Sequence, residues 1–366
     1  MCPPHSLTVK FRVPNLHSLE STRADGYENG TTYENYIDIA GEDYCIYFFD
    51  TENKFIAQFE PLLATATEGK NYTEYNIQGE TPEALRSHQD FKVVVAANWG
   101  KTFYTTSIST LDELYQAQTF DISGLTIANL GPGKRLIPFY GVHQYQNVEY
   151  KPNIPTVLSD PVSLIRAVAK VEILLEKDPI IDYKFSSVKI HNYNSQGYCA
   201  PNNIDSEEKY IHGKWEDDYI RALNIPDNQK KTETIDLPLI SEDYSEGEKK
   251  YRLYAGYLPE YDNKDEDFSY IEAMFDFQLE GAEANKIYFA KYTDGKTDNA
   301  VDKRYNIERN NLYRFKVKYD SYKLELFVSN WFGWYDNNFE FGDGQVATPI
   351  SPWDDEITND ADFNLE

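Results

Sequence analysis

The chain has 366 residues, with 61 acidic against 35 basic side chains and a formal net charge of −26. Such a charge repels the phosphate backbone of nucleic acids, which makes nucleic acid an unexpected partner. The length favours two domains, and the aromatic content of 15 %, with 30 Tyr and 20 Phe, favours β-strands over helix interiors. We therefore expect an all-β protein with two hydrophobic cores.

The first segment with strand periodicity begins at residue 7 and ends at Pro14. Polar Thr8, Lys10 and Arg12 alternate with four apolar side chains, which gives the strand one buried face: Leu7, Val9, Phe11 and Val13. Residues 14–32 are polar, contain two glycines and show no periodicity, so they are interpreted as an exposed connector with Arg23 in its middle.

The rest of the first half indicates further strands and two short helices. Aromatic runs at residues 44–49 and 55–59 flank a polar turn and predict a β-hairpin, and residues 91–97 form the continuous apolar run of a central strand. Thr81-Pro82-Glu83 is typical of a helix start, and Thr110 with Glu113 has the spacing of a capping box.

A proline-rich stretch around residues 141–160 separates this half from a second set of strands. The first of these strands, 165–175, has one apolar face and one polar face that carries Arg166, Lys170 and Glu172. No long helix intervenes between the later strands, which implies antiparallel sheets and a sandwich in each half. The expected later strands are 188–193, 251–258, 271–279, 313–319 and 324–334. The predicted division is 1–157, 158–342 and an acidic tail at 343–366.

Catalytic chemistry has no recognisable motif in the sequence. The six His residues are scattered without an HExxH pattern. Gly131-Pro-Gly-Lys134 lacks the spacing of a phosphate loop and is interpreted as a turn, and Tyr261 to Asp267 departs from a calcium-binding loop at Lys264. We therefore expect no enzyme activity, no metal site and no cofactor.

The three cysteines, Cys2, Cys45 and Cys199, show no CxxC spacing. Cys45 and Cys199 are interpreted as small buried thiols in different domains, whereas Cys2 precedes the first foldable segment. No run of eighteen apolar residues is present. The chain also begins without the apolar segment of a signal peptide, so it is either cytosolic or has lost an export signal before its first residue.

Several stretches resemble Bacteroidales-type fimbrillins and the related fimbrial anchor and tip lipoproteins. The most specific is Leu164-Ile-Arg-Ala-Val-Ala-Lys-Val-Glu-Ile173, which looks like the strand that opens the second domain in that group. Others follow in the expected order: Tyr47-Phe-Phe-Asp50, Val95 to Gly100, Ile137-Pro-Phe-Tyr-Gly141, Tyr257-Leu-Pro-Glu260, and Ile307-Glu-Arg-Asn310 with Leu312-Tyr313.

The resemblance implies two transthyretin-like Greek-key β-sandwich domains with a few short helices, export to the cell outer membrane, and a lipid anchor at Cys2. It also implies that an arginine-specific protease cuts between Arg23 and Ala24, which would make residues 1–23 a propeptide. The first strand, with Leu7, Val9, Phe11 and Val13, would then be exchangeable for a strand of another subunit. The tail at 343–366 is either a solvated end or a donor strand.

The expected function is therefore a structural subunit of a surface fimbria or pilus, as stalk, tip or anchor, which assembles with other fimbrial subunits by strand exchange and supports adhesion to host or bacterial surface ligands. The alternative is a monomeric surface lipoprotein that binds glycans. Trp99, Trp331 and Trp334 could stack on sugar rings in that case, or lie at strand ends in the core.

Overall fold

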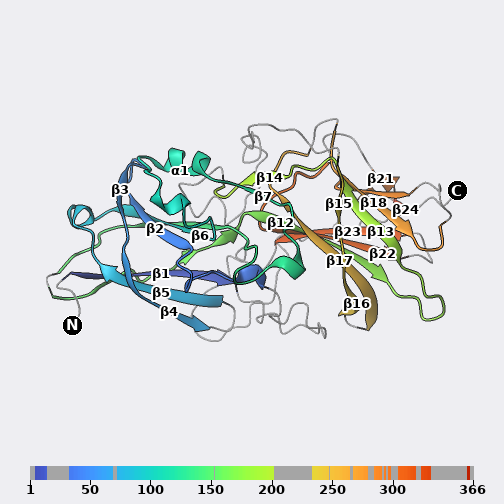
Figure 1. The fold of residues 1–366 in the computed structure, drawn as a ribbon, viewed down its shortest axis with the longest axis horizontal. Helices are drawn as coiled ribbons and strands as arrows, with labels where there is room; N and C mark the ends of the chain where they lie inside the picture. Colours follow the sequence, from blue (N-terminus) through green and yellow to red (C-terminus); the bar gives the residue numbers. More distant parts are fainter. Residues whose placement is uncertain are drawn as a thin grey trace.

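The computed structural model describes residues 5–14, 33–68, 72–151, 153–201, 233–246, 248–263, 267–278, 284–290, 292–293, 296–297, 304–318, 323–330 and 361–362. These residues form many strands, one α-helix and four short 3-10 helices. The predicted all-β class with a sandwich in each half is confirmed, and Figure 1 shows the two sandwiches side by side along the long axis.

Two five-stranded sheets make up the first sandwich. One has the order β10-β1-β5-β4, with β9 beside β1, and the other has the order β11-β8-β6-β2-β3. Their bounds are β1 Ser6–Pro14, β2 Tyr44–Phe49, β3 Phe55–Gln58, β4 Pro61–Glu68, β5 Tyr72–Glu80, β6 Phe91–Ala97, β8 Phe139–Tyr145, β9 Thr156–Val157, β10 Val162–Ser163 and β11 Ile165–Arg166.

The helices of the first half are short. Two of them, η4 and α1, pack buried side chains against the outer face of the sheet that contains β2, β6 and β8. The bounds are η2 Tyr33–Asn35, η3 Ala84–Ser87, η4 Phe103–Thr105, α1 Leu111–Ala117 and η5 Ile127–Asn129. The predicted cap is present at α1, because Thr110 Oγ1 accepts from Glu113 N at 3.2 Å. The reciprocal bond of Glu113 comes from Ser109 N at 2.7 Å, one residue before the N-cap. Within the described residues, no helix is long and apolar enough to span a membrane.

The second sandwich packs a six-stranded sheet, β16-β17-β12-β22-β23-β24, against a four-stranded sheet, β15-β13-β18-β19. The bounds are β12 Val168–Glu176, β13 Phe185–His191, β15 Ile235–Asp236, β16 Leu239–Glu246, β17 Lys249–Pro259, β18 Tyr270–Phe275, β19 Asn285–Tyr288, β22 Asn311–Lys318, β23 Lys323–Asn330 and β24 Ala361–Asp362. A small hairpin joins β20 Tyr292–Thr293 to β21 Lys296–Thr297.

The predicted strand 165–175 is divided at Ala167. Ile165 and Arg166 pair with β8 in the first sandwich, whereas Val168 onward pairs with β17 and β22 in the second. The chain therefore passes from one sandwich to the other within three residues, and strands of the first sandwich continue to Arg166. An apolar pattern cannot reveal this division, because both parts are buried in continuous cores.

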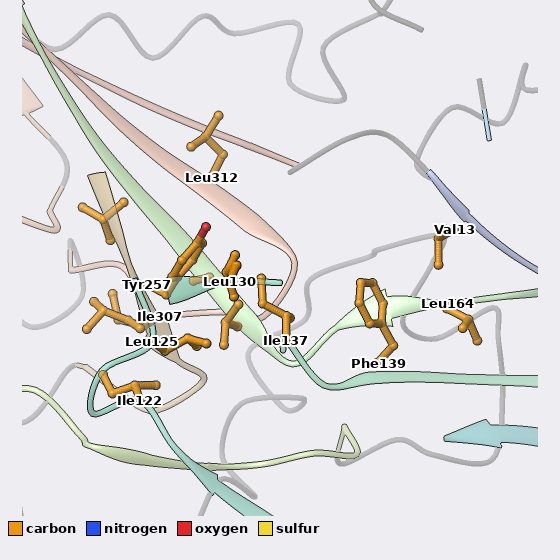
Figure 2. Close-up of a cluster of buried hydrophobic side chains, with 14 of the residues drawn as sticks. Val13, Ile122, Leu125, Leu130, Ile137, Phe139, Leu164, Tyr257, Ile307 and Leu312 are labelled. Carbon is orange, nitrogen blue, oxygen red and sulfur yellow. The ribbon is translucent and has the colours of Figure 1, made fainter. Parts of the chain in front are cut away.

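The two sandwiches share a buried core and a pair of strands. Thr119–Asp121 (β7) pairs with Gln196–Tyr198 (β14), so each half lends one strand to a two-stranded sheet. Figure 2 shows Ile122, Leu125 and Leu130 of the first half beside Tyr257 and Ile307 of the second. One continuous apolar cluster thus holds the halves together.

Candidate assembly site

Strand β1 places its four predicted apolar side chains in the core of the first sandwich. Leu7, Val9, Phe11 and Val13 are all buried. The ring of Phe11 stacks on Tyr75 of β5, with 5.1 Å between ring centroids, and lies 6.1 Å from Tyr44 of β2. Burial of four such side chains stabilises the strand by about 6–12 kcal/mol in total.

The backbone of β1 is paired on both sides. Its whole length is antiparallel to β5, from Ser6 opposite Glu80 to Pro14 opposite Tyr72. On the other side it runs parallel to β9, which lies beside Leu7 and Thr8, and to β10, which lies beside Phe11 and Arg12. Two further amides donate to β1 carbonyls, Leu158 N to Thr8 O at 3.0 Å and Leu164 N to Arg12 O at 2.9 Å. Removal of β1 would therefore leave backbone groups without partners on β5 at one side and on β9 and β10 at the other.

Polar side chains on the outer face of β1 make further contacts. Lys10 Nζ lies 3.7 Å from Glu74 Oε1 of β5, and Arg12 Nε donates to Ser163 Oγ of β10 at 3.0 Å. The guanidinium of Arg12 also lies over the ring of Tyr72. Because these contacts are partly solvated, they contribute less than the buried apolar face.

The proposed processing and anchoring residues, Cys2, Arg23 and Ala24, lie outside the described residues, as does the tail at 343–366 except for β24. The described chain resumes at η2, whose Glu34 reaches the second sandwich. Cleavage at Arg23 and lipidation at Cys2 therefore stay predictions.

Glu34 belongs to a buried group of charges at the junction of the two sandwiches. Its Oε1 lies 3.1 Å from Lys170 Nζ and accepts from the hydroxyl of Tyr257 at 2.5 Å. Lys170 Nζ also lies 3.2 Å from Glu172 Oε1, and Arg314 lies 2.6 Å from the other oxygen of Glu172. Burial alone would raise the pKa of Glu172, but Arg314 and Lys170 lower it to about 2.

Two buried arginines complete the junction. Arg166 donates to Asn310 Oδ1 at 2.9 Å and to Asn35 Oδ1, and its burial lowers its pKa to about 10. Arg309 pairs with Glu260 at 2.5 Å and donates to three carbonyls at the end of β14 and just after it, those of Tyr198, Cys199 and Ala200. Sequence reasoning placed Arg166, Lys170 and Glu172 on a polar strand face but did not predict their burial. The one feature of the sequence that set these residues apart is that they fall inside a stretch that carries the family resemblance, residues 164–173.

Of the tryptophans proposed for sugar stacking, the structure describes Trp99 alone. Trp99 is only 4 % exposed, and its indole donates to Phe139 O at 2.7 Å, so it is a core residue. Trp331 and Trp334 lie outside the described residues. The interpretation of Gly131 to Lys134 as a turn is confirmed, because Lys134 N donates to Gly131 O at 2.9 Å.

The two described thiols are free and buried, as predicted. Cys199 belongs to the second half of the chain, but its side chain packs into the same apolar cluster as Cys45 of β2. Burial raises the pKa of Cys45 to about 12 and that of Cys199 further. Among the described residues, no cluster of three or more His, Cys, Asp or Glu side chains could hold a metal ion.

Comparison with solved structures found similar chains. The tip fimbrial protein Mfa3 from Porphyromonas gingivalis, with a C-terminal truncation, has a TM-score of 0.52 at 12 % identity over 89 % of this chain and 98 % of that chain. A candidate cell adhesion protein from Bacteroides uniformis has a TM-score of 0.43 at 12 % identity over 88 % and 98 %. Another from Bacteroides ovatus has 0.43 at 11 % identity over 89 % and 97 %.

No protein-family model and no curated protein sequence matches the chain. The likeness to Mfa3 confirms the expected fimbrillin-type resemblance at the level of the fold, across both sandwiches.

Proposed function

We propose that the chain is a structural subunit of a cell-surface fimbria that assembles by strand exchange at the position of β1 and supports adhesion. The observation that carries the proposal is β1 itself. It is a first strand with a completely buried apolar face, paired on both sides, and it is joined to the rest of the chain through a polar connector. The fold shared with a tip fimbrial protein supports the same assignment.

The proposed maturation step is cleavage of the peptide bond between Arg23 and Ala24 by an arginine-specific protease. Cleavage leaves all contacts of β1 in place, so the strand is not released at once. It does remove the covalent link that keeps β1 at a high effective concentration beside its groove. An extended segment of another fimbrial subunit can then pair with β5 on one side and with β9 and β10 on the other.

Further parts of the proposal concern location and chemistry. Cys2 is proposed as the lipidated residue that anchors a precursor or an anchor subunit to the outer membrane. No enzyme activity is proposed, since strand exchange replaces one set of non-covalent contacts by another and needs no nucleotide. Stalk, tip and anchor roles differ in whether β1 is removed, and Arg23 favours a processed stalk or tip subunit.

The proposal is tested by digestion of the full chain with an arginine-specific protease, followed by mass spectrometry and by exchange with a labelled peptide of residues 5–14. The expected result is one early cut after Arg23 and slow incorporation of the labelled peptide into the cut chain only. Arg23→Lys is the matched control, because it keeps the charge but resists the protease.

The role of β1 is tested separately with Phe11→Ala. Loss of a buried phenylalanine destabilises by about 3–5 kcal/mol, so the cut variant should exchange its strand at least about a hundredfold faster. Lys10→Ala, on the outer face, should change the rate little. A cut chain that never takes up the peptide, even when Phe11 is replaced, would contradict strand exchange at this site.

A further inference from the structure

A second place suited to strand pairing is the edge formed by β4 in the sheet that contains β1. Strand β4 is the last strand of this sheet, and its only partner among the described strands is β5. Figure 1 shows β4 beyond β5 at the outer edge of the first sandwich. An unpaired edge exposes a row of backbone N–H and C=O groups that another strand can bind.

The side chains of β4 do not protect this edge. Seven of its eight residues are exposed and Ala64 is half-buried, with Leu62 at 70 % and Leu63 at 51 %. Soluble proteins usually protect such edges with lysines, inward-pointing charges, prolines or β-bulges. In β4 a proline and a register irregularity against β5 are confined to the first residues, between Pro61 and Leu63. From Leu63 to Thr67 the sequence Leu-Ala-Thr-Ala-Thr has none of these devices.

We propose that this edge pairs with β4 of a second copy of the chain, antiparallel about a two-fold axis. Residues that face each other across an antiparallel pair lie on the same side of the sheet, so the two positions must differ by an even number. Regular pairing in β4 begins at Leu63, after the register irregularity. We place the axis at Thr65, where the two Thr65 side chains face each other and residues 63–67 are paired. Leu63 faces Thr67 of the second copy, and Ala64 faces Ala66.

The charges of β4 fit this arrangement. The strand has one charged side chain, Glu68, at its end. With the axis at Thr65, Glu68 lies beyond the paired residues 63–67 and does not face Glu68 of the other copy, so no like charges meet. The two Thr65 side chains form a cross-strand threonine pair, which is a favourable neighbour in sheets. Two sheets of five strands would thus join into one sheet of ten.

The long-range charge opposes the contact. Each copy carries a formal net charge of −26, so two copies repel each other at low ionic strength. Salt screens this repulsion over distances of about 10 Å at 0.1 M. The pairing should therefore strengthen as the salt concentration rises, which is opposite to the behaviour of a contact held by ion pairs.

The contact is tested by sedimentation velocity of the intact, uncut chain over a range of protein and salt concentrations. A monomer–dimer equilibrium that shifts toward the dimer with salt is expected. The double variant Thr65→Lys, Thr67→Lys should weaken the dimer by about tenfold or more. Gln78→Lys is the matched control, since Gln78 is exposed on the same face but belongs to the interior strand β5.

Cross-linking tests the position of the axis. In a Cys2→Ser background, Thr65→Cys should form a disulfide-linked dimer on mild oxidation, because directly facing residues have Cβ atoms about 4.5–5.5 Å apart. Gln78→Cys should not. A wild-type chain that stays monomeric at every soluble concentration, a dimer that the double lysine variant leaves unchanged, or equal cross-linking at both positions would each overturn the proposal. Because none of these experiments involves cleavage at Arg23, their failure would leave the exchange of β1 untouched.

Discussion

Replacement of Lys170 by methionine should strongly destabilise the chain. Lys170 lies between the carboxylates of Glu34 and Glu172, at 3.1 and 3.2 Å, and the side chains of all three are 1 % exposed. Methionine keeps the length of the side chain but removes its charge, so Glu34 loses a buried ion-pair partner while it keeps its hydrogen bond from the hydroxyl of Tyr257. The loss of one partner from a buried ion pair costs about 3–5 kcal/mol.

The measurement is urea unfolding of Lys170→Met followed by far-UV circular dichroism. Lys177→Met is the matched control, since Lys177 pairs with Asp243 at 2.6 Å but at the surface, where 26 % and 66 % of the two side chains are exposed. Exposed pairs contribute about 0–1 kcal/mol. Addition of Glu34→Gln to Lys170→Met should recover part of the loss, because it removes the carboxylate that has lost its ion-pair partner. Equal stability of the two lysine variants would refute the coupling of the halves through this group.

Three further results are expected. The pKa of Glu172 is about 2 in the folded chain and 4.5 when unperturbed, so its contribution to stability is complete above about pH 4.5 and disappears as the pH falls toward 2; urea midpoints of the wild type should decline across that window more steeply than those of Glu172→Gln. The buried thiols Cys45 and Cys199 should resist an aromatic disulfide reagent at pH 8 in the native Cys2→Ser chain and react in denaturant, and rapid native labelling would contradict their burial. Thr110→Ala should lower stability by about 1 kcal/mol through loss of the α1 cap, whereas an unchanged unfolding midpoint would mean that the cap contributes nothing.

The strands with a clear apolar alternation were predictable from the sequence. The buried face of β1 follows from its alternation of apolar and polar residues, and the hairpin of β2 and β3 follows from two aromatic runs around a polar turn. The hairpin of β4 and β5 was missed, because the exposed β4 is rich in Ala and Thr and has no buried face to produce a pattern. The predicted helix after Pro82 is a single 3-10 turn, η3, without a side-chain cap.

The junction was not predictable, because its contacts join residues that are distant in the sequence. Glu34 meets Tyr257 and Lys170, and Arg309 meets the carbonyls after β14. A lone Lys or Glu on a strand is normally solvated, and only its neighbours in space decide that it is buried. The division of the strand at Ala167 was not predictable either, because both parts of the strand are apolar and paired.

The stretches that carry the family resemblance meet at this junction. Arg166 bonds to Asn310, and Glu260 pairs with Arg309, so three of those stretches contact one another directly. The segment 162–168 also forms part of the candidate assembly site, because β10 pairs with β1 two residues before β11 pairs with β8. The bond from Arg166 to Asn310 of the second sandwich therefore helps to fix the position of β10, the strand that pairs with β1. Residues 162–166 must therefore fit β1, β8 and the second sandwich at once, because Val162 and Ser163 pair with β1, Ile165 and Arg166 pair with β8, and Arg166 bonds to Asn310.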